Sequence, residues 1–223
     1  MNKYIEIKKA LDQKYFIINK TKIRNISDKC DYESLFQRKR EKMIIIHKAL
    51  KQCHKCDLYK SRTQPVTGAG NVDANALFIG EAPGANEDIK GLPFVGRAGE
   101  LLTKYLNEID LSRKDIFITN IIKCRPPGNR DPNDEEIESC FPYLKEQIKI
   151  IDPKVIVTLG RHSLATLLNR NVKITKERGI FIDYNERLLL PMLHPAAVLR
   201  NNGLDKYMRE DFITLREALK NEH

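Results

Sequence analysis

The 223-residue sequence predicts an α/β protein whose sheet is parallel or mostly parallel and is covered by helices on both faces. Two observations indicate this class. Four short apolar runs of strand length alternate with longer stretches of helical character. Three of these runs are followed at once by a polar or glycine-rich segment, and ligands of such sheets bind beyond the carboxyl ends of the strands. We therefore expect a binding crevice where those three segments converge.

The strands are expected at the four apolar runs, which cover residues 76–79, 116–119, 155–159 and 188–193. Helices are expected over roughly 97–109, 134–150, 161–168 and 205–220. A preceding helix over 32–52 is indicated by its apolar positions, and it delivers the chain to Cys53. Those positions are Leu35, Phe36, Met43, Ile46, Ala49 and Leu50.

The charge of the chain is basic and uneven. The formal net charge is +9, and residues 1–50 contribute +7 of it, from thirteen Lys and Arg against six Asp and Glu. We treat residues 1–50 as a basic N-terminal extension of unknown role and residues 51–223 as the functional domain. The excess charge fits a polyanionic partner, because neutralising phosphates releases counterions. A solvated, lysine-rich extension without such a partner fits the charge equally well.

Membrane and export signals are missing from the sequence. No apolar run reaches transmembrane length, and the first residues mix charge into every turn where a signal peptide would have an apolar core. These features predict a cytoplasmic protein with no membrane partner, in a compartment that keeps thiols reduced. We expect the protein to act as a monomer.

Four of the five cysteines form a pattern that is typical of a metal centre. Cys53 and Cys56 make a CxxC pair, and Cys124 and Cys140 lie far downstream on either side of fifteen residues. Four thiolates suit a tetrahedral zinc ion or a [4Fe-4S] cluster, and the spacing does not choose between them. The alternative is a CxxC redox pair with two buried core cysteines, which we consider the weaker interpretation.

Three polar or aromatic side chains stand at or near the ends of predicted strands. Glu81 follows the first strand in a turn rich in glycine and proline, where it can hold a water molecule or simply cap a helix. Phe94 lies between a proline and two glycines, which suits an aromatic platform for a base or a small satellite core. Asn120 directly follows a strand, and its amide can pair with one edge of a nucleobase or cap the strand end.

The segment from His194 to Asn201 combines an imidazole with an apolar and then basic tip. His194 can donate a hydrogen bond to a developing anion. Val198 and Leu199 can wedge into a base stack, with Arg200 on a phosphate. The plain alternative is a loop that opens a helix. The other histidines, His47, His54, His162 and His223, have no comparable setting.

Several motifs occur in the order of one known family. They are GEAPG-x2-ED-x2-GLPFVG-x-AGELL from Gly80, TNIIKCRPPGNRDP from Thr119, VIVTLG from Val155 and HPAAVLRN from His194. Together with the four cysteines they resemble the family 4 (type-4) uracil-DNA glycosylases over about residues 50–220. The resemblance implies a three-layer α/β/α sandwich around a central four-stranded parallel sheet. It also implies that Cys53, Cys56, Cys124 and Cys140 hold a [4Fe-4S] cluster.

The resemblance assigns the substrate-binding residues. Phe94 is implied to stack on a flipped-out uracil, and Asn120 to read its Watson–Crick edge. Glu87 is implied to crowd the C5 side of the base, where thymine carries a methyl group. His194 is implied to stabilise negative charge at O2 as the base leaves.

The part of the implied site that would hold the attacking water is unusual. Glu81, with Ala82 and Pro83, is implied to line the pocket and place the attacking water, and Asn129 to assist it. Related families carry an aspartate where this chain has Ala82, so a strong base is missing there. A glycosidic bond that breaks through an oxocarbenium-like state needs little push from water, which makes this departure tolerable.

The implied activity is hydrolysis of the N-glycosidic bond of uracil in single- and double-stranded DNA, leaving an abasic site. The resemblance assigns no lysine to the reaction, so strand cleavage through a Schiff base is not expected. Ala82 keeps open a second interpretation, a nucleic-acid-binding iron–sulfur protein that recognises uracil without cleaving it.

Overall fold

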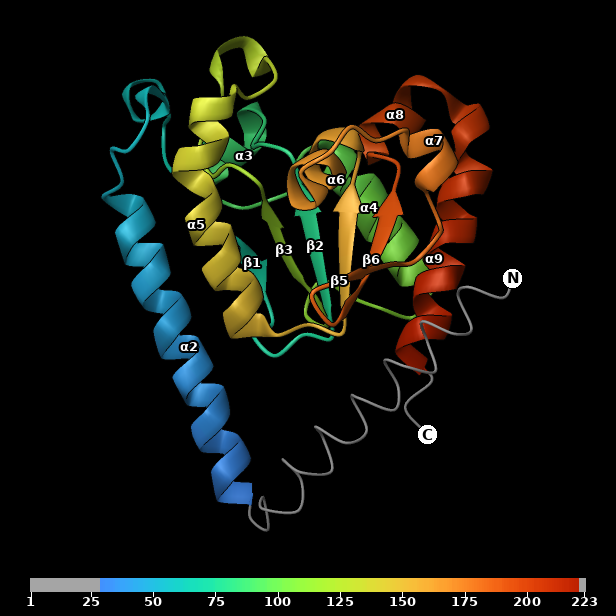
Figure 1. The fold of residues 1–223 in the computed structure, drawn as a ribbon, viewed down its shortest axis with the longest axis horizontal. Helices are drawn as coiled ribbons and strands as arrows, with labels where there is room; N and C mark the ends of the chain where they lie inside the picture. Colours follow the sequence, from blue (N-terminus) through green and yellow to red (C-terminus); the bar gives the residue numbers. More distant parts are fainter. Residues whose placement is uncertain (1–28, 221–223) are drawn as a thin grey trace.

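The computed structural model describes residues 29–220, and its centre is a six-stranded sheet with the order β1-β3-β2-β4-β6-β5 (Figure 1). The four central strands are β3 (Phe117–Asn120), β2 (Ala76–Gly80), β4 (Val155–Leu159) and β6 (Arg187–Met192). Each is parallel to its neighbours in that row. The sequence prediction of a four-stranded parallel centre is therefore confirmed.

Two short edge strands extend the predicted sheet. β1 (Ala69–Gly70) pairs antiparallel with β3, and β5 (Ile182–Tyr184) pairs antiparallel with β6. Every residue of β2, β3 and β4 is buried, as expected for parallel strands covered on both faces, whereas β1 and β5 are partly exposed. Edge strands of two and three residues are too short to produce an apolar run, so the sequence pattern did not reveal them.

Helices cover both faces of the sheet, which completes the predicted α/β/α sandwich. On one face, α4 (Arg97–Glu108) and α9 (Asp205–Lys220) contribute Leu102, Leu106 and Phe212 to a core that includes Phe78. On the other face, α5 (Asp134–Ile151) and α6 (Arg161–Leu168) pack against the alternate strand positions. The remaining elements are α3 (Ala85–Lys90), α7 (Ile174–Glu177), α8 (Pro195–Arg200) and the 3-10 turns η1 (Asp57–Lys60), η2 (Pro127–Asn129) and η3 (Asn202–Leu204).

The start of α5 follows directly from its sequence. The Asn133 side chain accepts a hydrogen bond from the Glu136 backbone N–H (2.8 Å), and the Glu136 carboxylate accepts one from the Asn133 N–H (3.0 Å). This capping box satisfies backbone donors that the first helical turn leaves free. Arg130 also donates to the Glu136 carboxylate, so the loop before the helix is tied to its first turn. The helix begins at residue 134, where it was predicted.

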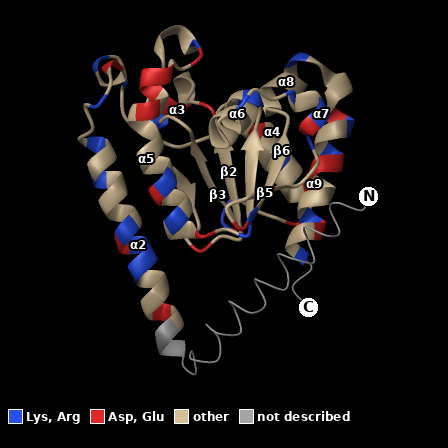
Figure 2. Ribbon diagram, in the orientation of Figure 1, with Lys and Arg blue, Asp and Glu red and all other residues tan. Residues whose placement is uncertain are grey.

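The long helix α2 (Lys29–Lys51) lies beside α5 (Figure 1). Lys39 joins it to the rest of the fold by an ion pair with Asp73 (2.5 Å) and a hydrogen bond to the carbonyl of Ile151 (3.0 Å). Met43 and Leu50 of this helix are buried. The second half of the basic extension is thus packed on the domain, and residues 1–28 lie outside the described part of the chain. Figure 2 shows lysines and arginines along α2.

Between residues 29 and 220, none of the helices is both long and apolar enough to cross a bilayer.

Candidate active site and cysteine centre

The carboxyl ends of the central strands open into one cavity of about 620 Å³. Because these strands run in the same direction, the segments that follow them meet at one edge of the sheet. Every predicted catalytic or substrate-binding residue lines this cavity, together with Arg200 of the predicted DNA-binding tip. These residues are Glu81, Ala82, Pro83, Glu87, Phe94, Asn120, Asn129 and His194. The expected convergence of the three strand-end segments is therefore observed.

Asn120, the last residue of β3, presents an unsatisfied amide to the cavity. Its side chain is almost completely buried, and its Oδ1 atom has no hydrogen-bond partner among residues 29–220. A buried polar atom without a partner is costly, so a donor supplied by a ligand is favoured there. Gly80 on the neighbouring strand makes room for it, because a Cβ at that position would collide with Oδ1 of Asn120 and with the Phe94 ring.

Phe94 is held in place by its backbone. Its φ of 52° lies in the left-handed region, which is uncommon for a bulky residue. Arg113 donates to the carbonyls of Pro93 (2.6 Å) and Phe94 (3.0 Å), so the turn is fixed from one side. A Cβ at Gly99 would strike the Phe94 carbonyl, so only glycine allows this close approach. The ring is buried, and its centroid lies 5.6 Å from that of His194.

Glu87 fixes the same loop from the other side. One carboxylate oxygen accepts hydrogen bonds from the backbone N–H groups of Val95 (2.8 Å) and Gly96 (2.9 Å). The residue lines the cavity, as its predicted place beside the base requires, and it also orders the residues that follow Phe94. The backbone clamp from Arg113 was not found in the sequence, because a lone arginine before a predicted strand looks like a surface cation.

His194 caps the short helix α8. Its Nδ1 atom accepts a hydrogen bond from the backbone N–H of Ala196 (3.1 Å), which leaves the proton of a neutral imidazole on Nε2. Burial lowers the pKa of His194 to about 4, and the positive charge of Arg200 acts in the same direction. Near neutral pH the side chain is therefore a neutral, oriented hydrogen-bond donor.

Glu81 belongs to a cluster that sequence reasoning missed. One ligand atom each of Glu81, Asp131 and His162 lie within 4.8 Å of one another. Burial raises the pKa of Glu81, whereas the charges of His162 and Arg161 lower it. His162, which was not predicted to belong to a site, thus lies at the active-site end of β4. Its position three residues after the end of the strand at Leu159 was the available signal.

The His162 ring has two neighbours at the same nitrogen. Its Nε2 atom lies 3.1 Å from a carboxylate oxygen of Asp131 and 2.8 Å from a guanidinium nitrogen of Arg161. A protonated ring pairs with Asp131, and a neutral ring with Nε2 unprotonated accepts from Arg161. Ala82 adds no acidic group to this part of the cavity, so Glu81 and Asp131 are the carboxylates beside the imidazole.

The predicted tip of α8 divides into an inner and an outer part. Val198 is buried in the core, whereas Leu199 is 47 % exposed and Arg200 is exposed. Of the two proposed wedge residues, only Leu199 is available to another molecule in this structure. Burial of Val198 follows from the geometry of α8, which turns that side chain toward the core.

Asn129 is an exposed residue in the loop between Cys124 and α5. Its φ is 57°, and its side-chain oxygen accepts a hydrogen bond from Nε of Arg125 (2.7 Å). It lines the same cavity as Glu81, as an assistant to the water would need to do.

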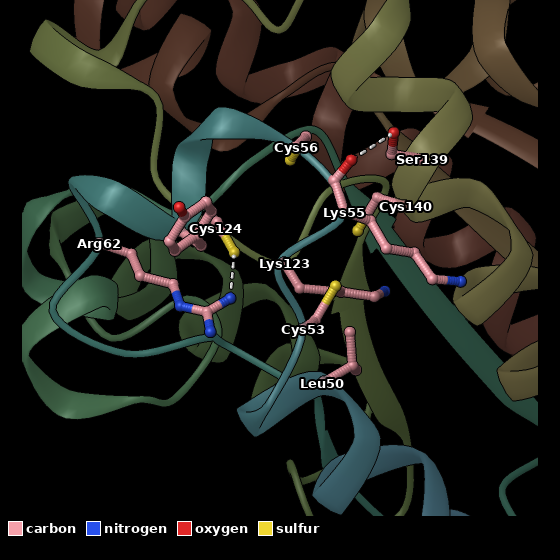
Figure 3. Close-up of a pocket in the computed structure, with 10 residues that line it drawn as sticks. Leu50, Cys53, Lys55, Cys56, Arg62, Lys123, Cys124, Ser139 and Cys140 are labelled. Carbon is pink, nitrogen blue, oxygen red and sulfur yellow. Dashed lines mark hydrogen bonds between the residues drawn. The ribbon is translucent and has the colours of Figure 1, made fainter.

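The four predicted cysteine ligands surround one small space (Figure 3). Cys53, Cys56, Cys124 and Cys140 are all free, and they come from three separate stretches of chain, as the sequence predicted. Burial raises the pKa of Cys140 to about 11, whereas the charge of Lys123 lowers it. Arg62 donates to the sulfur of Cys124 (3.1 Å). Buried thiols beside two cations are stabilised as thiolates when a metal binds.

Four cysteine thiols around one space are the donor set of either a tetrahedral zinc ion or a [4Fe-4S] cluster, and the residues present fit both groups.

Comparison with known proteins identifies the class to which this fold and cavity belong. Residues 67–219 match the model of the uracil DNA glycosylase superfamily. The chain is 51 % identical over 184 residues to a type-4 uracil-DNA glycosylase of Saccharolobus solfataricus, covering 78 % of this chain and 85 % of that protein. It is 44 % identical over 186 residues to the type-4 uracil-DNA glycosylase of Thermotoga maritima, covering 82 % of this chain and 97 % of that protein. The chain belongs to the type-4 uracil-DNA glycosylase family.

Proposed function

We propose that this protein is a DNA repair hydrolase that removes uracil from DNA and leaves an abasic site. The observation that carries the proposal is the buried Asn120 amide, with its unpartnered oxygen, in one cavity with the Phe94 ring and the neutral His194 imidazole. These three side chains suit a flat base with adjacent donor and acceptor groups, because the ring can stack on the base and the amide can pair with its edge.

Base recognition follows from the Asn120 amide. Its Oδ1 atom is free to accept from N3–H of uracil, and its NH₂ group then faces O4. Cytosine offers an acceptor at N3 and a donor at its amino group, so the same fixed amide meets the wrong pattern. Stacking on an aromatic ring contributes about 1–3 kcal/mol per base, and Phe94 is positioned to supply it. Glu87, held by Val95 and Gly96, limits the space beside the base and is proposed to exclude the thymine methyl group.

Bond cleavage depends on stabilising the departing uracil. As the glycosidic bond breaks, negative charge develops on the base, and a fixed donor favours that charge over the neutral ground state. His194 supplies such a donor because Ala196 occupies its Nδ1 atom and leaves Nε2–H for the base.

Water attack is assigned to the opposite side of the cavity. Glu81 lies there with Asp131 and His162, and we propose that it orients the attacking water with help from Asn129. Within the described part of the chain no lysine lines the cavity, which supports simple hydrolysis without a Schiff-base intermediate. The exposed Leu199 and Arg200 are proposed to contact DNA, where Leu199 fills the gap left by the flipped base.

The cysteine centre is proposed to hold a [4Fe-4S] cluster on Cys53, Cys56, Cys124 and Cys140. Four cysteines from three stretches of chain supply the ligands, and the motifs shared with the type-4 family support a [4Fe-4S] cluster over zinc. When bound, the cluster would cross-link the CxxC segment to the start of the loop before α5, at Cys124, and to α5 itself, at Cys140. We propose a reducing intracellular compartment, which suits the free cysteines. Residues of a single chain line the cavity, and this supports a protein that acts as a monomer. Its proposed substrates are single- and double-stranded DNA.

A uracil-containing oligonucleotide, single- or double-stranded, tests the proposed function. Incubation with the protein followed by hot alkali is expected to cut the strand at the uracil, and incubation without alkali is expected to leave it intact. Cutting without alkali would indicate a lyase. Tight binding without any cleavage would indicate a protein that recognises uracil without excising it, and would refute the proposed hydrolysis.

A further inference from the structure

Lys123 is a buried cation that joins the two sites described above. Its side chain is completely buried, and it lines the cysteine cavity beside Cys124 and Cys140 (Figure 3). Its ammonium group donates to the main-chain carbonyl of Asn120 at 2.5 Å. Only two residues of chain thus separate the base-reading asparagine from its anchor next to the metal ligands.

The ammonium group has a full set of hydrogen-bond acceptors. Besides the Asn120 carbonyl, it donates to Thr119 Oγ1 (2.7 Å) and to Gln147 Oε1 (2.8 Å). The Gln147 amide in turn donates to the carbonyl of Thr67 (2.5 Å). An ammonium group has three N–H donors, and all three are used here. Such a complete network fixes the position of whatever it touches, including the Asn120 backbone.

All three acceptors are neutral, so the positive charge must be balanced elsewhere. Lys123 forms no ion pair with a carboxylate within residues 29–220; burial lowers its pKa to about 8, and the sulfurs of Cys140 and Cys124 raise it when they are ionised. A buried cation without a counter-charge is strongly unfavourable. Four metal-bound thiolates carry net negative charge with either zinc or an iron–sulfur cluster, and they supply that counter-charge.

We propose that Lys123 is a positioning residue through which the metal centre holds the Asn120 reader in place. The thiolates anchor the ammonium group, the ammonium group anchors the Asn120 carbonyl, and the adjacent backbone is further fixed by the Ile121 N–H bond to Gly80 (2.9 Å). The centre would then contribute to base selection without touching the base. This inference rests on the proposed function.

Lys123→Met tests the link, because methionine keeps most of the volume and removes the charge and the donors. We expect the purified variant to keep its metal, to bind undamaged DNA normally, and to excise uracil about tenfold or more slowly in single turnovers, as is typical when a residue supporting a site is lost. Hydrogen–deuterium exchange of the segment 117–120 is expected to accelerate. Lys48→Met is the matched control, because Lys48 is an exposed lysine in the last turn of α2, and it should change none of these values.

A second experiment serves if Lys123→Met fails to fold. Removing the metal from the wild-type protein with a chelator should accelerate exchange over 117–120 while β4 stays protected. In Gln147→Glu, the new carboxylate pairs with Lys123 directly, so the segment should stay protected after the metal is removed. A folded Lys123→Met protein with wild-type excision and exchange would overturn the proposal. So would an equal acceleration of exchange over 117–120 in Gln147→Glu and in the wild-type protein after the metal is removed. A wild-type protein that excises no uracil at all would instead refute the proposed function.

Discussion

The replacement of His194 by alanine is the sharpest test of the proposed chemistry. The change removes the Nε2–H donor that faces the cavity and also the Nδ1 acceptor that caps α8. Loss of one preorganised donor to a developing anion costs about 10²–10³ in rate, or about 2.7–4 kcal/mol of transition-state stabilisation. Loss of a helix cap costs about 1 kcal/mol of folding stability.

The two losses can be separated by a second variant. Asparagine is a good capping residue, so His194→Asn should restore most of the folding stability but not the donor at the position of imidazole Nε2. Single-turnover excision under saturating enzyme measures the chemical step, and urea unfolding measures stability. We expect both variants to be slow, with near-normal affinity for uracil-containing DNA, and only the alanine variant to be less stable at neutral pH.

Because the pKa of His194 is lowered, the His194→Ala variant should also change how folding stability depends on pH. The folded protein resists protonation of His194 down to about pH 4, whereas an unfolded chain takes up the proton near pH 6.5. The folded state therefore loses stability as the pH falls through this window, by up to about 3 kcal/mol from this residue. His194→Ala should flatten that part of the curve. A variant that binds poorly but cleaves at full rate once saturated would refute the leaving-group role.

Further substitutions test the other assignments. Asn120→Asp replaces the amide donor facing O4 with an acceptor, so uracil excision should fall sharply and weak cytosine excision should emerge in an oligonucleotide assay; unchanged uracil activity would exclude Asn120 as the reader. Glu87→Ala should permit some thymine removal from a T:G duplex and weaken uracil binding through the loosened Phe94 loop. Leu199→Ala should slow excision from double-stranded DNA more than from single-stranded DNA, and equal losses would argue against the wedge. Cys140→Ala should lower the folded yield and abolish the broad visible absorbance of a [4Fe-4S] cluster, whereas colourless wild-type protein with stoichiometric zinc would contradict the cluster.

Residues whose role depends on local sequence were predictable. The central strands were found because each is a continuous apolar run, and α5 because its helical stretch was expected over residues 134–150. The cavity was anticipated because parallel strands place their carboxyl ends together. Glu81, Asn120 and His194 follow directly from that rule.

Residues whose role depends on distant partners were not predictable. Lys123 and Arg113 read as ordinary surface cations, and only the folded chain shows their carbonyl acceptors. His162 gains its setting from Asp131 and Glu81, which are far away in sequence. Val198 was expected to be available to DNA, but the orientation of a six-residue helix decides which of two adjacent apolar side chains is buried.

The close contact at Gly80 has a consequence for engineering new base specificities. Most cavity residues stand on connections that follow the strands, where a changed side chain does not have to fit between the strands of the sheet. Gly80 is different, because any side chain there would displace both the Asn120 amide and the Phe94 ring. A combinatorial library that varies positions 82, 94 and 120 should therefore keep glycine at position 80. Within that restriction, the strand that carries Gly80 keeps the space in which a different side chain at position 120 can be placed.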